Sequence, residues 1–254
     1  ARLYPEGTAP AIEGDTQAFV ERITKLPLAH QPGTQFEYGF SIDVLGAVVE
    51  KVSEQRLGEY LSANLWKPLG MSDATFAPTE AQRPRLARPF ANDPLTGKPQ
   101  AIKLLDTPTR SDCGGACSFA TIGDYVRFGQ MLLNGGELGG VRLLGPKTLK
   151  LMTSNHLPGG VDLPAMSRSM FAEAAYNGIG FGLGFSVTMD PAKTLIPGSA
   201  GEYAWGGAAS TAFWIDPAED LITIFMTQVL PSSAYPIRRE LRTMVYAAIT
   251  ESNV

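Results

Sequence analysis

The chain has 254 residues, of which 44% are hydrophobic and 18% are charged, so its composition is that of a folded globular protein. The formal net charge is −4 and the longest basic run is the pair Arg238-Arg239, which argues against a nucleic-acid partner. No stretch approaches the roughly 20 apolar residues that cross a bilayer, and we expect a soluble protein whose compartment, cytoplasmic or periplasmic, stays open.

The first part of the chain shows the apolar spacing of amphipathic helices. Helices are expected at residues 15–26, 41–52, 57–65, 121–134 and 146–153. Asp15 and Thr121 are residue types that cap helix starts, while Pro68 and Gly70 are expected to stop the third helix.

The pattern changes to glycine-rich, alternating segments from residue 178 onward. These segments predict adjacent antiparallel strands and a closing helix, at residues 180–187, 210–216, 221–229 and 236–249. The expected organisation is a mainly helical and loop region at 1–175 and strands with a final helix at 176–254, interleaved as one structural unit. The fold class is therefore predicted to be α+β.

Cysteines and histidines are scarce, with two of each. Cys113 and Cys117 lack the partners of a zinc site, and we expect two buried thiols, with a local disulfide as the alternative. Neither His30 nor His156 stands in a recognisable nucleophile signature, and ordinary polar roles are expected for both. Few histidines favour a Ser-Lys-Tyr hydrolase over a Ser-His-Asp one.

Four sequence blocks carry a specific resemblance. Residues 31–46, QPGTQFEYGFSIDVLG, look like the tyrosine-motif segment of β-lactamase-like esterases, and residues 65–71, LWKPLGM, follow one helix later. Residues 114–121 through 134–136 are similar to the glycine-rich loop and helix, and 205–208, WGGA, to the third catalytic motif. The chain thus resembles the β-lactamase and penicillin-binding serine hydrolase superfamily, including class C β-lactamases, and is most similar to family VIII carboxylesterases.

The resemblance implies a β-lactamase/transpeptidase-like fold, with an antiparallel sheet flanked by helices and a separate helical region. It also implies a Ser-x-x-Lys motif, in which the lysine helps to deprotonate the serine nucleophile. No Ser or Thr in the chain has a Lys three residues later. We therefore expect a chain incomplete at its N-terminus, whose uncovered surface pairs with a second copy or with the N-terminal complement.

The same resemblance assigns the site residues. Tyr38 would relay a proton between the serine oxygen and the leaving group, and the amide of Ala208 would donate to the oxyanion. Phe40 stands where β-lactamases carry Asn, and Trp205 where they carry Lys or His; both would contact substrate. Residues 206–207, two glycines, would let the backbone approach the ligand. The alternatives are a buried aromatic at position 38 and a simple strand bulge at 206–207.

The predicted activity is that of a carboxylesterase acting on small esters through an acyl-enzyme, without metal or cofactor. One alternative is a noncatalytic fragment that binds a ligand or a partner chain, because the Ser-x-x-Lys motif is absent. Another is a β-lactamase or D-amino-acid peptidase, which the apolar residues Phe40 and Trp205 disfavour.

Overall fold

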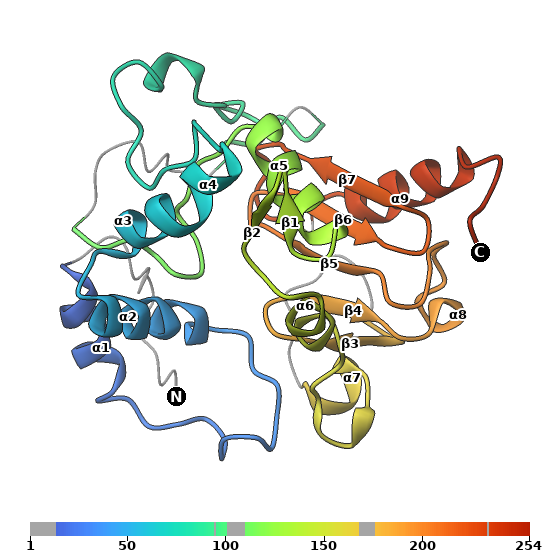
Figure 1. Ribbon diagram of the computed structural model, residues 1–254, viewed down its shortest axis with the longest axis horizontal. Coiled ribbons are helices and arrows are strands. Elements are labelled where there is room, and N and C mark those ends of the chain that lie inside the picture. Colours follow the sequence, from blue (N-terminus) through green and yellow to red (C-terminus); the bar gives the residue numbers. More distant parts are fainter. Residues whose placement is uncertain (1–13, 94, 101–109, 168–175, 233) are drawn as a thin grey trace. The chain divides into compact units, whose positions relative to one another are not determined.

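The computed structural model describes residues 14–93, 95–100, 110–167, 176–232 and 234–254 (Figure 1). The chain forms two compact units, each assembled from several separate stretches of sequence. Unit 1 contains Ala1–Pro32, Tyr38–Leu86 and Leu104–Asp124, and unit 2 contains Gly33–Glu37, Ala87–Lys103 and Tyr125–Val254. In the part of the chain that is described, no helix combines the length and apolar character needed to cross a membrane.

Unit 1 is helical, as its apolar periodicity predicts. Its main elements are α1 (Thr16–Ile23), α2 (Ser41–Ser53), α3 (Leu57–Leu61), the π-helical turn η1 (Ser62–Trp66), α4 (Lys67–Leu69) and the 3-10 turn η2 (Arg83–Arg85). The cap prediction at Asp15 is confirmed, because its side chain accepts a 2.8 Å hydrogen bond from the amide of Ala18.

The third predicted helix runs further than expected. The chain continues from α3 through η1 into α4 and ends at Gly70, which adopts a left-handed φ of 68°. Pro68 does not stop the helix, because it lies just after the π-helical turn η1, where the regular hydrogen-bond pattern is already interrupted. The expected stop at Pro68 is therefore wrong and the stop at Gly70 is confirmed.

Helix α5 (Ile122–Leu133) confirms both predicted ends of the fourth helix. Thr121 caps the start by accepting a 3.1 Å hydrogen bond from the amide of Asp124. At the other end the amide of Gly136 donates to the carbonyl of Met131 at 2.8 Å, which satisfies a carbonyl of the last turn.

Unit 2 is built on a five-stranded antiparallel sheet whose strands follow one another in chain order (Figure 1). They are β3 (Ile179–Phe181), β4 (Ser186–Thr188), β5 (Tyr203–Gly206), β6 (Ala212–Asp216) and β7 (Leu221–Phe225). Smaller elements are the hairpin β1 (Glu137–Leu138) and β2 (Val141–Arg142), then α6 (Pro146–Met152), η3 (Pro158–Gly160), α7 (Leu163–Met166) and α8 (Pro191–Thr194). The predicted α+β class with antiparallel strands is confirmed, but segments 180–187 and 210–216 are not adjacent, because β5 pairs with β4 on one side and with β6 on the other.

Two strand boundaries differ from the prediction. The segment 180–187 is a hairpin rather than one strand, because the amide of Gly182 donates to the carbonyl of Phe185 at 2.7 Å and the chain reverses there. The last strand ends at residue 225 instead of 229. Val229 leaves the ladder because its amide donates to the carbonyl of Ala209, in the turn between β5 and β6, at 3.1 Å.

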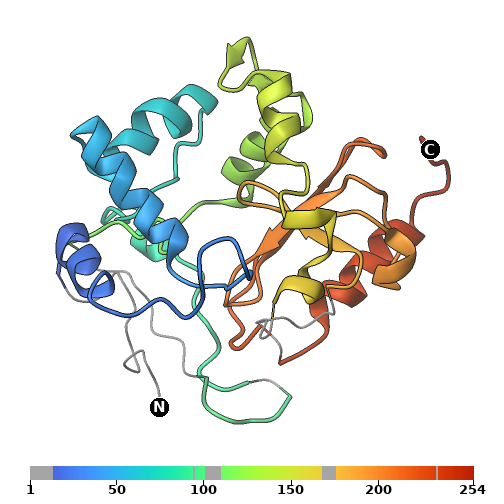
Figure 2. The same cartoon turned by 90° about the horizontal axis from the view of Figure 1, so that it is seen from below.

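Helices cover both faces of the sheet in unit 2. The closing helix α9 (Ile237–Ala247) runs along one face (Figure 2). On this face the guanidinium of Arg242 lies 5.3 Å from the ring centroid of Trp214. On the other face, the rings of Tyr125 on α5 and Phe213 on β6 are 5.2 Å apart. Phe213 and Trp214, which are neighbours on β6, therefore point to opposite faces of the sheet, as strand geometry requires.

Candidate active site

The structure divides the predicted site residues between the two units. Tyr38 and Phe40 lie in unit 1, at the start of α2, whereas Trp205, Gly206, Gly207 and Ala208 lie in unit 2, at the end of β5. Each group is built by contacts within its own unit.

Tyr38 has an exposed phenol, with 46% of the residue accessible to solvent. This contradicts the alternative reading of a buried core aromatic. Phe40, the N-cap residue of α2, packs its ring edge-to-face against Phe19 of α1, at 5.8 Å between centroids. The ring of Phe40 therefore has a packing partner, and its contact with substrate stays a prediction.

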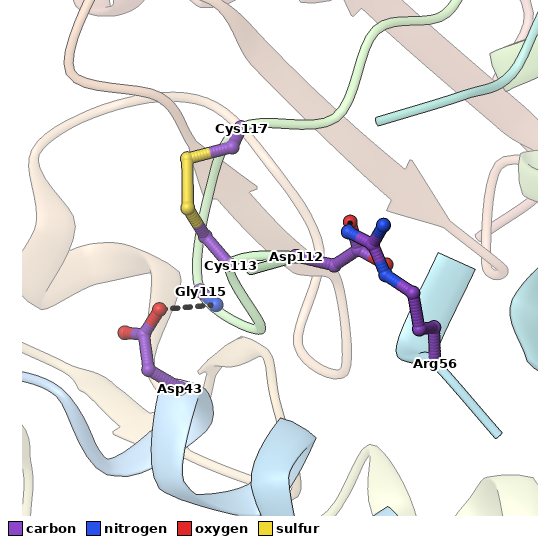
Figure 3. The surroundings of a disulfide bond; sticks show 6 residues. All are labelled: Asp43, Arg56, Asp112, Cys113, Gly115 and Cys117. Atoms are coloured by element: carbon purple, nitrogen blue, oxygen red, sulfur yellow. Dashed lines mark hydrogen bonds and ion pairs between the residues drawn. A yellow bond between two sulfur atoms is a disulfide. The ribbon is translucent and has the colours of Figure 1, made fainter. Parts of the chain in front are cut away.

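A buried carboxylate supports the helix that follows Tyr38. Asp43, in the first turn of α2, is only 8% exposed, and it accepts a 3.3 Å hydrogen bond from the amide of Gly115 (Figure 3). Burial raises the pKa of Asp43 above its ordinary value, and the hydrogen bond from Gly115 opposes that rise. The contact ties the start of α2 to the glycine-rich loop.

This loop is closed by a disulfide bond between Cys113 and Cys117 (Figure 3). The expectation of two free thiols is wrong, and the alternative of a local disulfide is correct. The chain reverses through Gly114 and Gly115, so that the two cysteine Cα atoms come within 5.6 Å, which is the usual disulfide range. That reversal depends on contacts with α2 that spacing alone does not reveal.

The loop packs closely on α2 and is also held by α3. A Cβ atom added at Gly114 would lie 2.2 Å from the carbonyl oxygen of Ile42, so only glycine fits at this position. Next to the disulfide, Asp112 is buried and accepts hydrogen bonds from the side chain of Arg56, at 2.7 Å, and the amide of Gly58, at 2.8 Å. The disulfide loop is thus anchored to two helices of unit 1.

In unit 2, Trp205 belongs to a row of aromatic rings. Its ring lies 5.3 Å from Phe181 on β3, and Phe181 lies 4.8 Å from Phe36. The amide of Phe36 donates to the carbonyl of Met166 at 3.0 Å, which secures the segment that leads to Tyr38. Tryptophan at position 205 therefore has a packing role, and its predicted contact with substrate stays a prediction.

The turn after β5 is extensively hydrogen-bonded. The amide of Gly207 donates to the carbonyl of Thr211 at 2.9 Å, and the amide of Ser210 donates to the carbonyl of Gly207 at 3.1 Å. Ser210 has a left-handed φ of 69°, and its buried hydroxyl donates to the carbonyl of Val229 at 2.7 Å. These bonds brace both arms of the turn.

Ala208 sits exposed at the tip of this turn. Among the hydrogen bonds of the described residues, none uses the N–H of Ala208. A hydrogen-bonded turn with an unbonded amide at its exposed tip is an arrangement that an oxyanion donor requires.

Gly206 and Gly207 have local structural reasons to be glycine. A Cβ atom added at Gly206 would lie 2.7 Å from the guanidinium carbon of Arg238, and one added at Gly207 would lie 2.3 Å from the hydroxyl of Thr211. The pairing of β5 with β6 is regular up to Gly206 and Ala212, so the two glycines do not form a strand bulge. Close approach of a ligand to them stays a prediction.

A cavity of about 100 Å³ opens on the α9 face of the sheet, lined by residues from β4, β5, β6 and α9. Trp214 and Tyr176 contribute to its wall, and Glu202 and Arg242 form a buried ion pair beside it. Tyr203, in contrast, packs against Phe185 in the sheet core, where burial raises the pKa of its phenol.

Sequence reasoning missed two features of unit 2. In the sequence Arg238 stands out only as half of a basic pair, yet its guanidinium binds the turn that carries Ala208. The ion pair between Glu202 and Arg242 joins residues 40 positions apart in sequence, and no local pattern signals it. Within the described residues, no three His, Cys, Asp or Glu side chains gather in a way that could hold a metal ion.

One family model and several known proteins are similar to this chain. The sequence model of the family described as Beta-lactamase matches residues 1–247. Protein Rv1367c of Mycobacterium tuberculosis is 34% identical over 216 residues, which cover 82% of this chain and 52% of that protein. Esterase EstB of Burkholderia gladioli is 29% identical over 241 residues, which cover 92% of this chain and 60% of the esterase.

Solved structures agree on the fold. EstCE1, a hydrolase with promiscuous acyltransferase activity, matches with a TM-score of 0.72 at 22% identity, covering 92% of this chain and 62% of its own. The LovD6 mutant of simvastatin synthase from Aspergillus terreus matches with a TM-score of 0.71 at 25% identity, covering 90% and 62%. These matches confirm the predicted β-lactamase/transpeptidase-like fold. The chain spans little more than half the length of the curated relatives it matches.

Proposed function

Because the chain belongs to the Beta-lactamase family, whose fold is that of serine hydrolases with esterase and acyltransferase relatives, we propose that it forms part of a carboxylesterase. The proposed reaction cleaves small esters through an acyl-enzyme intermediate. The observation that carries the proposal is the available N–H of Ala208 at the exposed tip of a turn whose flanking residues Gly207 and Ser210 are hydrogen-bonded.

In this reaction a serine oxygen attacks the acyl carbonyl and the carbonyl oxygen becomes negatively charged. The N–H of Ala208 donates to that oxyanion, which stabilises the transition state more than the substrate. Tyr38 takes up the proton that the serine hydroxyl loses and passes it to the alcohol that leaves as the ester C–O bond breaks, and water then hydrolyses the acyl-serine. The exposed position of Tyr38 supports this role, because a relay group must be reachable by substrate.

The nucleophile is proposed to come from polypeptide outside these 254 residues. The chain contains no Ser or Thr followed by Lys three residues later, and that pair is the first motif of the superfamily it resembles. The segment that supplies the pair would also cover surface that the two units otherwise leave to solvent.

Apolar residues at two positions favour an ester over a β-lactam as substrate. Phe40 and Trp205 replace the amide and the cation with which the superfamily's β-lactamases bind polar parts of their ligands. Relatives named as esterases, from Burkholderia gladioli and Penicillium rubens, support the same substrate class.

The experiment is hydrolysis of p-nitrophenyl butyrate by the 254-residue chain and by the protein extended with its upstream segment. A fluorophosphonate probe reports any reactive serine, and Tyr38→Phe is compared with Tyr60→Phe, another tyrosine of unit 1. We expect labelling and turnover only in the extended protein, with turnover lost in Tyr38→Phe and kept in Tyr60→Phe.

Other outcomes would contradict parts of the proposal. Stoichiometric labelling of the 254-residue chain would mean that its own serine is the nucleophile. An extended protein that does not hydrolyse aryl esters but rapidly hydrolyses a chromogenic cephalosporin would belong with the β-lactamases.

A noncatalytic role is the second candidate, and the absent Ser-x-x-Lys pair is the observation that favours it. In that case the 254-residue chain binds a ligand or pairs with a partner through its uncovered surface. Sedimentation distinguishes the two, because a self-associating chain without labelling by the probe fits this role, whereas a labelled, catalytic monomer excludes it.

A further inference from the structure

Arg238, in the first turn of α9, reaches across to the turn between β5 and β6. Its Nη2 atom donates to the carbonyl oxygen of Gly207 at 2.6 Å and to that of Thr211 at 2.9 Å. Gly207 directly follows β5 and Thr211 directly precedes β6, so the two carbonyls stand on opposite arms of the turn. One guanidinium therefore ties both arms together.

The chain makes room for this guanidinium at Gly206. A Cβ atom added there would lie 2.7 Å from both the Cζ and the Nη2 atoms of Arg238, well inside contact distance. Any larger residue at position 206 would push the guanidinium away from the turn. The glycine of the third motif thus serves the contact with Arg238.

The carbonyl that Arg238 binds and the N–H of Ala208 belong to one peptide unit. That unit, between Gly207 and Ala208, is planar and trans, so a group that holds its oxygen also sets the direction of its N–H. A hydrogen bond from a charged donor is roughly twice as strong as a neutral one, and it polarises the peptide so that the N–H donates more strongly.

We infer that Arg238 is a positioning residue of the oxyanion hole, which aims and polarises the N–H of Ala208 through the Gly207 carbonyl. The inference rests on the proposed function, because that N–H meets an oxyanion only if the protein performs acyl transfer. Arg238 acts through the peptide and not on the substrate. Because the oxyanion develops only in the transition state, loss of Arg238 lowers kcat much more than it changes KM.

The test compares Arg238→Gln with Arg239→Gln, which removes the same charge from the next, exposed residue of α9. The first measurement is the amide proton shift and hydrogen-exchange rate of Ala208 in the 254-residue chain. The second is kcat and KM for p-nitrophenyl butyrate in the extended protein. We expect an upfield shift and faster exchange of the Ala208 amide, and a fall in kcat of about 10-fold with KM within about twofold, for Arg238→Gln alone.

The inference is overturned if Arg238→Gln matches Arg239→Gln in both measurements. An extended wild-type protein that hydrolyses no ester defeats the proposed function, yet the Ala208 amide shift still decides whether Arg238 polarises the turn. If Arg238→Gln does not fold, Arg238→Lys and rescue of Arg238→Ala by added methylguanidinium replace it. Rescue of the kcat of Arg238→Ala by methylguanidinium supports the inference. If neither Arg238→Lys nor added methylguanidinium restores kcat, the inference is contradicted.

Discussion

Arg242, on α9, forms a buried ion pair with Glu202, the residue immediately before β5. Glu202 is only 1% exposed, and it also accepts a hydrogen bond from the hydroxyl of Tyr246, one helical turn after Arg242. Arg238 lies one turn before Arg242 and therefore on the same side of α9. The ion pair that fixes α9 on the sheet thus also delivers Arg238 to the turn beyond β5.

Removing the cation of this pair should strongly destabilise unit 2. In Arg242→Met the carboxylate of Glu202 stays buried without its partner, and we expect the free energy of unfolding to fall by about 3 to 5 kcal/mol. Urea unfolding followed by tryptophan fluorescence measures the change. Arg239→Met is the control, because this neighbouring arginine is exposed, and its effect should stay within about 0.5 kcal/mol.

A double variant separates the ion pair from simple packing. Glu202→Gln combined with Arg242→Met removes both charges, so the double variant should be more stable than Arg242→Met alone. If the two single losses simply add, the carboxylate and the guanidinium are not energetically coupled.

Replacing either of two aspartates of unit 1 should change the pH dependence of stability, but in opposite directions. Burial raises the pKa of Asp43, so its contribution is fully present below the unfolded pKa and is lost as pH rises through the folded pKa. Asp43→Asn should therefore gain stability relative to wild type as pH increases from about 3 to about 7. Urea unfolding across this range measures the difference.

Asp73 provides the opposite case for that measurement. Its hydrogen bonds from Arg85 lower its pKa, so its contribution is present above the unfolded pKa and is lost as pH falls through the folded pKa. Asp73→Asn should lose stability relative to wild type as pH increases. Parallel pH profiles for the two variants would contradict this assignment.

Opening the disulfide should loosen the loop that holds α2. The double variant Cys113→Ser/Cys117→Ser should lose about 2 kcal/mol of unfolding free energy, because a short closed loop restricts the unfolded chain only modestly. Titration with a thiol reagent should find no free thiol in the unreduced protein. Dithiothreitol should destabilise the wild type to the same extent and leave the double variant unchanged.

The close approach of the disulfide loop to α2 should make position 114 intolerant of any side chain. Gly114→Ala places a Cβ atom 2.2 Å from the carbonyl oxygen of Ile42, and we expect a loss of about 3 kcal/mol in unfolding free energy. At Gly39 an added Cβ would meet nothing within 4 Å, so Gly39→Ala should be neutral or slightly stabilising. Equal melting temperatures for the two variants would show that the loop is not packed as described.

The helices of the chain could be predicted from the sequence because the signals that form them are local. Apolar spacing, the cap at Asp15 and the glycines after α5 each act within a few residues, and the structure confirms them. The expected stop at Pro68 was wrong because the effect of this proline depends on the π-helical turn just before it, which the sequence pattern does not show. The resemblance in four motif blocks, also readable along the sequence, pointed to the family that the comparisons show.

The sequence by itself determined the α+β class, the positions of the main helices and the family. Only the tertiary structure decided that Cys113 and Cys117 form a disulfide, that residues 180–187 fold into a hairpin, and that Arg238 holds the turn at Gly207. For Arg238 the physical reason is distance along the chain, whereas the disulfide and the hairpin join nearby residues and depend on contacts with the elements around them. A hydrogen bond between residues 31 positions apart exists only once the sheet and α9 have packed together, and no local pattern encodes it.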